Sequence, residues 1–321
     1  MSKRNSLANR FISILVLSAL CLLCFCGCQK NDGKVITNEG VTFTDALGRT
    51  VTVANTPQRT AALIGSFADV WSLAGGKVCA TVDDAWEDFD LDLEDAQNLG
   101  GAHSPSLEAL IASNPDFVIA SASTASNVEM KEALQNAGIT VAYFDVDNFD
   151  DYLDMLKICT DITGRNDLYE KNGLDVKSRI EKIKADFEKA EVPEEKRKVL
   201  IIRTSASVIK AKGSEGTILG EMLSDLGCIN IADSDKSLLD TLSVESIIRN
   251  EPYHIFVVTM GDDTGKATEN LSRMMDENPT WKSLEAVKEN RFHIMDKNLF
   301  NIKPNAKWAN AYEELTKILL K

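Results

Sequence analysis

The chain has few of the residues and motifs from which enzyme active sites are commonly built. Its 321 residues include only three histidines, His103, His254 and His293, which lie far apart in the sequence. No G-x-S-x-G, H-E-x-x-H or P-loop motif is present. We expect His254 and His293 to be core or edge residues of strands, whereas His103 stands in a loop before a helix and could reach a cleft. The sequence therefore gives little support to catalysis.

Cysteine is scarce outside the N-terminal segment. Of the seven cysteines, only Cys79, Cys159 and Cys228 lie beyond residue 28. These three are scattered in apolar surroundings without C-x-x-C spacing, so the sequence predicts neither a metal site nor a redox pair. We expect them to behave as small buried apolar residues.

Positive charge is also in deficit. The chain has 35 lysines and arginines against 49 aspartates and glutamates, a formal net charge of −14. The first 27 residues carry three basic and no acidic residues, so removing them leaves a net charge of −17. Such a chain is not expected to bind nucleic acid or acidic lipid.

The one long apolar run is too short to span a membrane. It extends from Phe11 to Phe25, follows Lys3, Arg4 and Arg10, and precedes Cys26-Gly27-Cys28-Gln29. A membrane-spanning helix needs roughly 20 apolar residues, whereas a basic start with a shorter apolar run is typical of a secretory signal peptide. Gly27-Cys28 resembles the bacterial lipobox, in which the cysteine is lipidated, although Phe25 replaces the usual leucine.

We therefore predict a lipoprotein signal peptide at residues 1–27 and lipidation of Cys28. The polar residues 28–40 are predicted to form a tether that holds the folded part off the membrane. These features predict an extracytoplasmic protein that is lipid-anchored to the cell membrane.

Residues 166–190 have the pattern of one long amphipathic helix. Its apolar residues are spaced by seven, four, three and four positions, as on one helix face: Tyr169, Val176, Ile180, Ile183 and Phe187. At 1.5 Å per residue this helix would be roughly 37 Å long, which is more than one compact sheet requires. It could instead span two lobes. Gly173 interrupts the stripe, and we expect another backbone to approach it closely.

Similar segments, residues 106–119 and 243–256, flank this helix. The identities all occur at one constant offset: Ser106 with Ser243, Glu108 with Glu245, Ile111 with Ile248, and Pro115 with Pro252. Each copy predicts a capped helix, a proline that ends it, and an apolar strand. Two similar lobes joined by the long helix are the simplest explanation.

Strands and helices alternate through the rest of the chain. The pattern predicts a hairpin at 41–53, an acidic loop at 83–95, helices at 128–137, 271–276 and 306–320, and strands at 60–64, 78–82, 117–120, 139–144, 199–202, 255–259 and 292–295. Such alternation indicates parallel sheets covered on both faces. The predicted fold class is α/β, with a mainly parallel sheet in an N-terminal lobe (41–163), a bridging helix (164–190) and a second such sheet in a C-terminal lobe (191–321).

Two segments carry a resemblance to a known family. Phe43-Thr44-Asp45-Ala46-Leu47-Gly48-Arg49 with Pro57-Gln58-Arg59, and Asn278-Pro279-Thr280-Trp281 with Arg291-Phe292, resemble the opening and closing segments of helical-backbone periplasmic binding proteins. The resemblance covers residues 41–321. It implies two lobes bridged by one long helix and a ligand held between them. Members of this class feed iron-siderophore, haem and cobalamin importers.

The resemblance also implies partners. Members deliver their ligand to an ABC permease dimer with its ATPase subunits, and matching glutamates meet arginines on the two permease subunits, which implies docking roles for Glu108 and Glu245. Lys303-Pro304-Asn305 stands where many relatives have Gly-Pro-Arg at the cleft edge. Relatives that bind bare zinc or manganese use several histidines and a carboxylate, and this set is thin here.

Ligands of open α/β sheets bind beyond the carboxyl ends of the strands. The predicted ligand-binding residues that follow strands are Ser66, Phe67, Asp83, Trp86, Ser121, Ser123, Asp145, Arg203, Ser205 and Met260. Lys212, Lys303 and Asn305 are further candidates. Aromatic rings would pack on a flat ligand, and Arg203 would pair with its negative charge.

Two classes of function remain. The first is a monomeric, lipid-anchored substrate-binding protein that captures an iron-siderophore or related metal chelate, or alternatively a corrinoid or haem, with no cofactor of its own. The second is an exported α/β enzyme, for example a metal-dependent oxidoreductase. The lack of cysteine clusters and the export signal favour the first.

Overall fold

The computed structural model describes residues 35–37, 40–261 and 263–321. Residues 36–321 form one compact unit, to which the description below refers. The predicted signal peptide and Cys28 lie outside the described residues. Within the described part of the chain, no helix has both the length and the apolar character that a membrane crossing requires.

The N-terminal lobe is built on a parallel sheet with the strand order β6-β5-β4-β7-β8. Its strands are β4 (Thr60–Ala62), β5 (Val78–Thr81), β6 (Gln97–Asn98), β7 (Phe117–Ser121) and β8 (Thr140–Phe144). Its helices are α2 (Gly65–Leu73), α3 (Asp84–Glu87), α4 (Leu107–Ala112), α5 (Ala125–Glu129), α6 (Lys131–Asn136) and α7 (Phe149–Thr163). Alternate residues of β7 enter different core clusters, Phe117 and Ile119 one and Val118 the other, so the sheet is buried on both faces as predicted.

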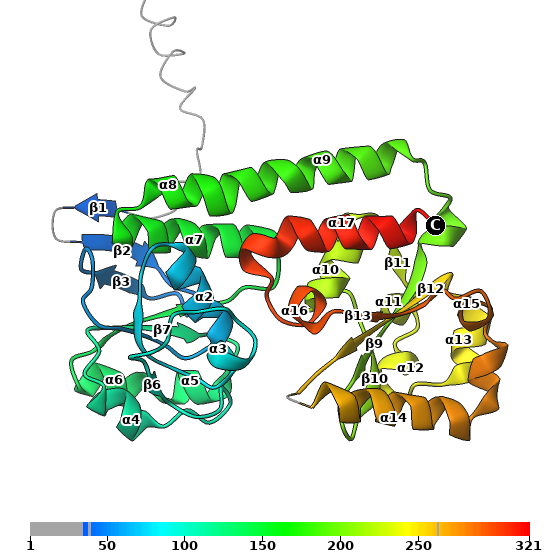
Figure 1. The fold of residues 1–321 in the computed structure, drawn as a ribbon, viewed down its shortest axis with the longest axis horizontal. Coiled ribbons are helices and arrows are strands. Elements are labelled where there is room, and N and C mark those ends of the chain that lie inside the picture. Colours follow the sequence, from blue (N-terminus) through cyan, green and yellow to red (C-terminus); the bar gives the residue numbers. More distant parts are fainter. Residues whose placement is uncertain (1–34, 38–39, 262) are drawn as a thin grey trace, which may run out of the picture. The chain divides into compact units, whose positions relative to one another are not determined.

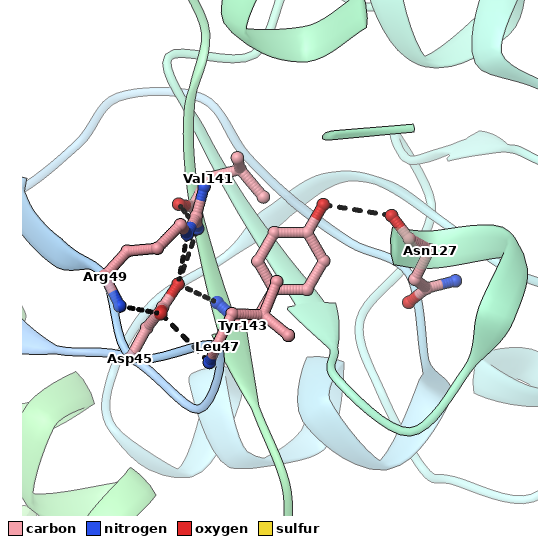
Figure 2. A network of polar contacts seen from close by, with 6 residues as sticks. All are labelled: Asp45, Leu47, Arg49, Asn127, Val141 and Tyr143. Carbon is pink, nitrogen blue, oxygen red and sulfur yellow. Dashed lines mark hydrogen bonds and ion pairs between the residues drawn. The ribbon is translucent and has the colours of Figure 1, made fainter. Parts of the chain in front are cut away.

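The predicted hairpin consists of β2 (Gly40–Thr44) and β3 (Thr50–Val53), with β1 (Val35–Thr37) at the edge of the same small sheet. Figure 2 shows the contacts made by its turn. The buried Asp45 carboxylate accepts hydrogen bonds from Arg49 Nη2 (2.5 Å) and from the Tyr143 amide (3.3 Å). Arg49 also donates to the Val141 carbonyl (3.0 Å), and the Tyr143 hydroxyl donates to the Asn127 carbonyl (3.0 Å). The opening motif thus holds the hairpin on β8.

The C-terminal lobe has a second sheet, with the strand order β10-β9-β12-β13 and β11 beside β9. Its strands are β9 (Lys198–Thr204), β10 (Ile209–Lys212), β11 (Ile229–Asn230), β12 (His254–Thr259) and β13 (Phe292–Met295); β10 alone among them pairs antiparallel. Its helices are α10 (Ile218–Asp225), α11 (Ile231–Ser234), α12 (Ser237–Asp240), α13 (Val244–Asn250), α14 (Thr264–Glu277), α15 (Glu285–Lys288), α16 (Lys297–Phe300) and α17 (Trp308–Leu319), with 3₁₀ turns η2 (Glu194–Arg197), η3 (Pro279–Ser283) and η4 (Asn305–Lys307). The predicted α/β class is confirmed.

The two repeated segments, residues 106–119 and 243–256, have equivalent structures. Ser106 caps α4 by accepting a hydrogen bond from the Ala109 amide (3.2 Å), and Ser243 caps α13 in the same way. Each helix is followed, just before the proline, by a residue in the left-handed conformation, Asn114 (φ 49°) or Glu251 (φ 48°). The next strands, β7 and β12, occupy inner positions of the two sheets. The two lobes therefore repeat one helix–strand unit.

The bridging helix is continuous, with α8 (Asn166–Tyr169), a π-helical turn η1 (Glu170–Leu174) and α9 (Asp175–Lys189). At its start, Asn172 accepts a hydrogen bond from the Tyr152 hydroxyl of α7 (2.8 Å). Farther along, Arg179 pairs with Glu313 of α17 (3.0 Å), and α9 runs alongside α17 (Figure 1). Lys184 then pairs with Asp225 at the end of α10. One helix thus contacts both lobes, as the sequence predicts.

The expectation about Gly173 was wrong in one respect. A Cβ atom at this position would lie 2.8 Å from Leu153 Cδ1 and 3.2 Å from Leu156 Cδ2. Side chains of α7, not another backbone, therefore occupy the space beside Gly173. The π-turn brings this part of the helix close to α7.

Several element bounds differ from the sequence-based expectations. The acidic loop at 83–95 contains the short helix α3, and the segment 128–137 is divided into α5 and α6 around Met130. Helix α14 begins at Thr264, seven residues before the expected start at Leu271. Its first turns are polar, and the Asp263 carboxylate caps them by accepting from the Lys266 amide (2.8 Å). Capping, not an apolar stripe, defines that end of the helix.

Candidate functional site

One ion pair between the lobes shows which edges of the two sheets face each other. Lys297, at the start of α16, follows β13, whereas Asp88 follows α3, which in turn follows β5. The Lys297 ammonium lies 2.8 Å and 3.0 Å from the two Asp88 carboxylate oxygens, and both side chains are largely buried. Because both segments come just after parallel strands, the carboxyl ends of the two sheets meet here. This is the edge at which α/β proteins bind ligands.

A second contact joins the lobes beside α2. The Asn305 side-chain amide, fully buried, donates to the Ser66 carbonyl (2.9 Å) and to Asp69 Oδ2 (2.8 Å). Burial raises the pKa of Asp69, against the opposing effect of the Asn305 hydrogen bond. Phe67 is also buried and packs edge-on against Phe144. The structure therefore brings Ser66, Phe67 and Asn305 together inside the junction, where they offer little surface to a ligand.

Backbone contact fixes the relation of α2 to α3. Asp84 Oδ1 accepts a hydrogen bond from the Gly65 amide (3.0 Å), and a Cβ atom on Gly65 would lie 2.7 Å from the Ala85 amide nitrogen. Burial raises the pKa of Asp84 to about 6, and the nearby carboxylates of Asp88 and Glu87 act in the same direction. A glycine is needed here because the first turns of α2 and α3, which both follow strands, touch.

Lys303 carries a positive charge into this junction. Its ammonium lies 5.8 Å from the centre of the Phe67 ring, in a cation–π contact. Burial lowers the pKa of Lys303, whereas the carboxylates of Asp147 and Asp145 raise it. Asp145 directly follows β8, as predicted for a residue at this edge. Lys303 is thus balanced by nearby acidic residues.

Arg203 and Lys212 belong to a cluster of positive charge without such balance. Lys210 of β10 lies directly opposite Arg203 of β9, and Lys212 is opposite Ile201, so all three basic side chains lie on one face of the sheet. Burial lowers the pKa of the half-buried Arg203, whose Nε has no hydrogen-bond partner. Burial and then the charges of Arg203 and Lys210 lower the pKa of Lys212. Within the described residues, none of the three is in an ion pair.

Large apolar side chains are exposed along the same edge. Trp86 in α3 is 40% exposed, Val208 in the turn between β9 and β10 is 45% exposed, and Met260 after β12 is 46% exposed. Single exposed apolar residues are common on protein surfaces. Three that follow carboxyl ends of strands, together with unpaired cations, are a combination suited to binding a ligand that is both apolar and anionic.

Of the other predicted residues, Asp83, Ser123 and Ser205 follow strands, whereas Ser121 is the last residue of β7; Arg203, also predicted to follow a strand, lies within β9. Asp83, half-buried, accepts from the Asn98 side-chain amide (2.7 Å). The Ser121 and Ser123 hydroxyls are 3.1 Å apart, Ser121 being buried and Ser123 exposed. The Ser205 hydroxyl accepts from the Val208 amide (3.1 Å) and shapes the β9–β10 turn. His103 is exposed in the loop before α4, and its contact with a ligand stays a prediction.

Lys297, Asp88 and Asp84 were missed by the sequence analysis. The strand-end rule could have found Asp84 and Lys297, since they follow β5 and β13 within three residues. The pairing of Lys297 with Asp88 could not be found in this way, because it joins positions more than two hundred residues apart.

The remaining histidines lie elsewhere. His254 opens β12 and is buried, and its Nδ1 is 3.1 Å from Nε2 of His293 on β13. Burial lowers the pKa of His254 to about 4, with smaller effects from His293 and Arg291. Among the residues that the structure covers, no group of three or more histidine, cysteine or acidic side chains is arranged to hold a metal ion.

The sequence and the fold agree with a known family. The sequence profile described as "Periplasmic binding protein" matches residues 61–299. The chain therefore belongs to the periplasmic binding protein family, as the two segments of resemblance implied.

Several known proteins resemble this chain at low sequence identity. The Fe(3+)-citrate-binding protein YfmC of Bacillus subtilis is 24% identical over 304 residues, which cover 91% of each chain. Staphylococcus aureus SirA, solved with staphyloferrin B, has a TM-score of 0.64 and 23% identity over 87% of this chain and 96% of its own. S. aureus IsdE, solved with haem, has a TM-score of 0.67 and 16% identity over 82% of this chain and 99% of its own.

Proposed function

We propose that this protein is the lipid-anchored substrate-binding protein of an ABC importer, and that it captures a negatively charged ferric chelate, such as an iron-siderophore, between its two lobes. The chelate is cargo, released unchanged to the permease dimer and its ATPase subunits, so the protein has no cofactor and no catalytic role. Membership of a periplasmic family and the signal-like N-terminus support an extracytoplasmic location.

The observation that carries this proposal is the cationic cluster of Arg203 and Lys212. A chain whose mature form has a net charge of −17 has ample carboxylates to pair with its basic residues. Yet these two partly buried side chains have no carboxylate partner among the described residues. Leaving a buried charge unpaired costs free energy, which an anionic ligand would offset. The exposed Trp86 and Met260 would cover the ligand's apolar surface.

Two experiments test the ligand class. Native mass spectrometry of protein purified from its own host should show a co-purifying ferric chelate with net negative charge. Titration of the ligand-free protein with ferric citrate and ferric hydroxycarboxylate siderophores should show tight one-to-one binding. Recovery of a corrinoid or haem, with no binding of ferric siderophores, would favour the alternative ligand of the same scaffold. Chemical turnover of the bound compound would refute the binding role.

We further propose that Glu108 and Glu245 dock onto the permease. Both carboxylates are exposed at the first turn of equivalent helices and accept a hydrogen bond from their own capping serine, Ser106 (3.4 Å) or Ser243 (3.0 Å). Hydrogen bonds from the Glu245 amide and then from the Ser243 hydroxyl lower the pKa of Glu245. One carboxylate on each lobe suits a permease made of two equivalent subunits.

Charge reversal tests the docking role. The double variant Glu108→Arg, Glu245→Arg should retain its affinity for the chelate, because both residues lie on helices outside the junction. It should lose binding to the permease and support no uptake. Normal uptake by this variant would refute the docking role while leaving the proposed ligand class intact.

A further inference from the structure

The repeat places a second pair of equivalent side chains on the surface. Ile111 of α4 is 40% exposed and Ile248 of α13 is 42% exposed. Their neighbours in the sequence, Leu110 and Ile247, are fully buried. Leu110 and Ile247 therefore pack each helix against the core, and the two exposed isoleucines do not have this role. An exposed isoleucine at the same position of both copies calls for another explanation.

Each exposed isoleucine lies beside a docking glutamate. Ile111 is three residues after Glu108, and Ile248 is three residues after Glu245, a spacing that places both side chains on the same side of a helix. Neither glutamate forms an ion pair within the part of the chain that the structure describes. Each lobe thus offers one unpaired carboxylate with one apolar group next to it.

On the C-terminal lobe, this surface is hollowed. A cavity of about 320 Å³ is lined by residues of α13 and of the segment before β13, among them Ile247, Ile248, Pro252, Leu284 and Arg291. Ile248 is therefore both exposed and part of the wall of a cavity large enough for a side chain. A partner that contacts Glu245 can also insert a side chain here, between apolar residues such as Ile248 and Leu284 and the charged residues Glu251, Glu285 and Arg291.

We propose that Ile111 and Ile248 are apolar anchors that pack against the two membrane-spanning subunits of the permease, one isoleucine on each subunit. The repeat offers the same surface on both lobes, so the binding partner should have two equivalent contact sites. Because the carboxylates of Glu108 and Glu245 are unpaired, each of these sites should have a basic residue beside an apolar one. A permease dimer meets both conditions. The inference rests on the docking role proposed for Glu108 and Glu245, and it assigns part of the binding energy to neighbouring apolar contacts.

The test compares the full chain with the variants Ile111→Ala, Ile248→Ala and the double variant. Ile229→Ala is the matched control, because Ile229 is also 42% exposed but lies on β11, away from α4 and α13. Binding to the permease complex in nanodiscs is measured at low and high salt, together with melting temperature and affinity for ferric citrate. Each anchor variant should weaken permease binding by about tenfold at both salt concentrations. The control should bind as the wild type does.

The salt dependence of permease binding distinguishes the contribution of the two glutamates from that of the two isoleucines. Glu108→Gln or Glu245→Gln should weaken binding mainly at low salt, because ionic contacts are screened and apolar ones are not. If the glutamine variants weaken docking and the alanine variants do not, the anchor role is refuted and the docking role stands. If neither set affects binding, both are refuted. A loss equalled by Ile229→Ala would also refute the anchor role.

Discussion

Replacing Arg203 with alanine removes the half-buried guanidinium from the cationic cluster of the C-terminal lobe. Among the residues that the structure describes, this group has no ion-pair partner, and burial already lowers its pKa. Its removal should therefore leave the melting temperature of the ligand-free protein at or slightly above the wild-type value, because no stabilising pair is lost. The same change deprives a bound anion of its partner.

The expected loss of ligand affinity can be estimated from the hydrogen bonds that the Arg203 guanidinium can donate to an anionic ligand. A hydrogen bond to a charged group contributes about 1.5 to 3 kcal/mol, and partial exposure reduces the upper end. We expect Arg203→Ala to cost about 2 kcal/mol of binding free energy, or about thirtyfold in affinity. Arg203→Lys should cost less, because it keeps the charge but loses the planar fork that binds a carboxylate with two parallel bonds.

Quenching of tryptophan fluorescence by ferric citrate or a ferric siderophore provides the assay, since Trp86 is exposed at the same edge. Lys210→Ala is the matched control, because Lys210 is directly opposite Arg203 but exposed, so its removal should change affinity by less than about threefold. An unchanged affinity in Arg203→Ala would remove this residue from the site. Equal losses in both variants would show that only general charge, not Arg203, matters.

Three further predictions concern motion and stability. Because a continuous helix and the Lys297–Asp88 pair connect the lobes, ligand should change the small-angle scattering curve little, and a radius of gyration that falls by several ångströms would contradict this. Asp45→Ala leaves Arg49 largely buried without its partner and should cost about 3 to 5 kcal/mol in chemical denaturation, so a loss below 1 kcal/mol would show that the network is not structural. The folded-state pKa of Asp84, about 6, is above its ordinary 3.8, so its contribution to stability is complete below pH 3.8 and is lost as the pH rises through about 6. Asp84→Asn should therefore be more stable than wild type by about 1 to 2 kcal/mol at pH 7.5 and gain nothing near pH 4; thermal unfolding at the two pH values measures this, and a gain independent of pH would contradict the assignment.

The long helix and the repeat could be predicted because each has a local signature. The stripe from Tyr169 to Phe187 has helical spacing, and its residues pack into the core as that spacing requires. The capping serines act through bonds to residues three positions away. The π-turn that brings Asn172 to Tyr152 has no such local signature, because it depends on contact with α7.

The sequence predicted candidate site residues only by their position near the carboxyl ends of strands. The rule that places ligands after strands selected Arg203, Trp86 and Met260, whose side chains the structure leaves at least partly accessible, although Arg203 is the last but one residue of β9. It does not distinguish these from Phe67, which follows a strand equally closely but turns into the core of the N-terminal lobe. Burial is decided by packing between distant segments, such as α2 with η4, and the sequence does not show which segments meet.

The strand β10 has a consequence beyond ligand binding. It is the end strand of its sheet, and end strands with unpaired backbone groups can add strands from other molecules. Lys210 and Lys212 occupy this strand, and charged side chains, lysine above all, oppose such edge-to-edge association. Proteins anchored by a lipid are confined to a plane and meet one another far more often than in free solution. If the protein is lipid-anchored as proposed, we expect the same two lysines to keep neighbouring copies from joining their sheets.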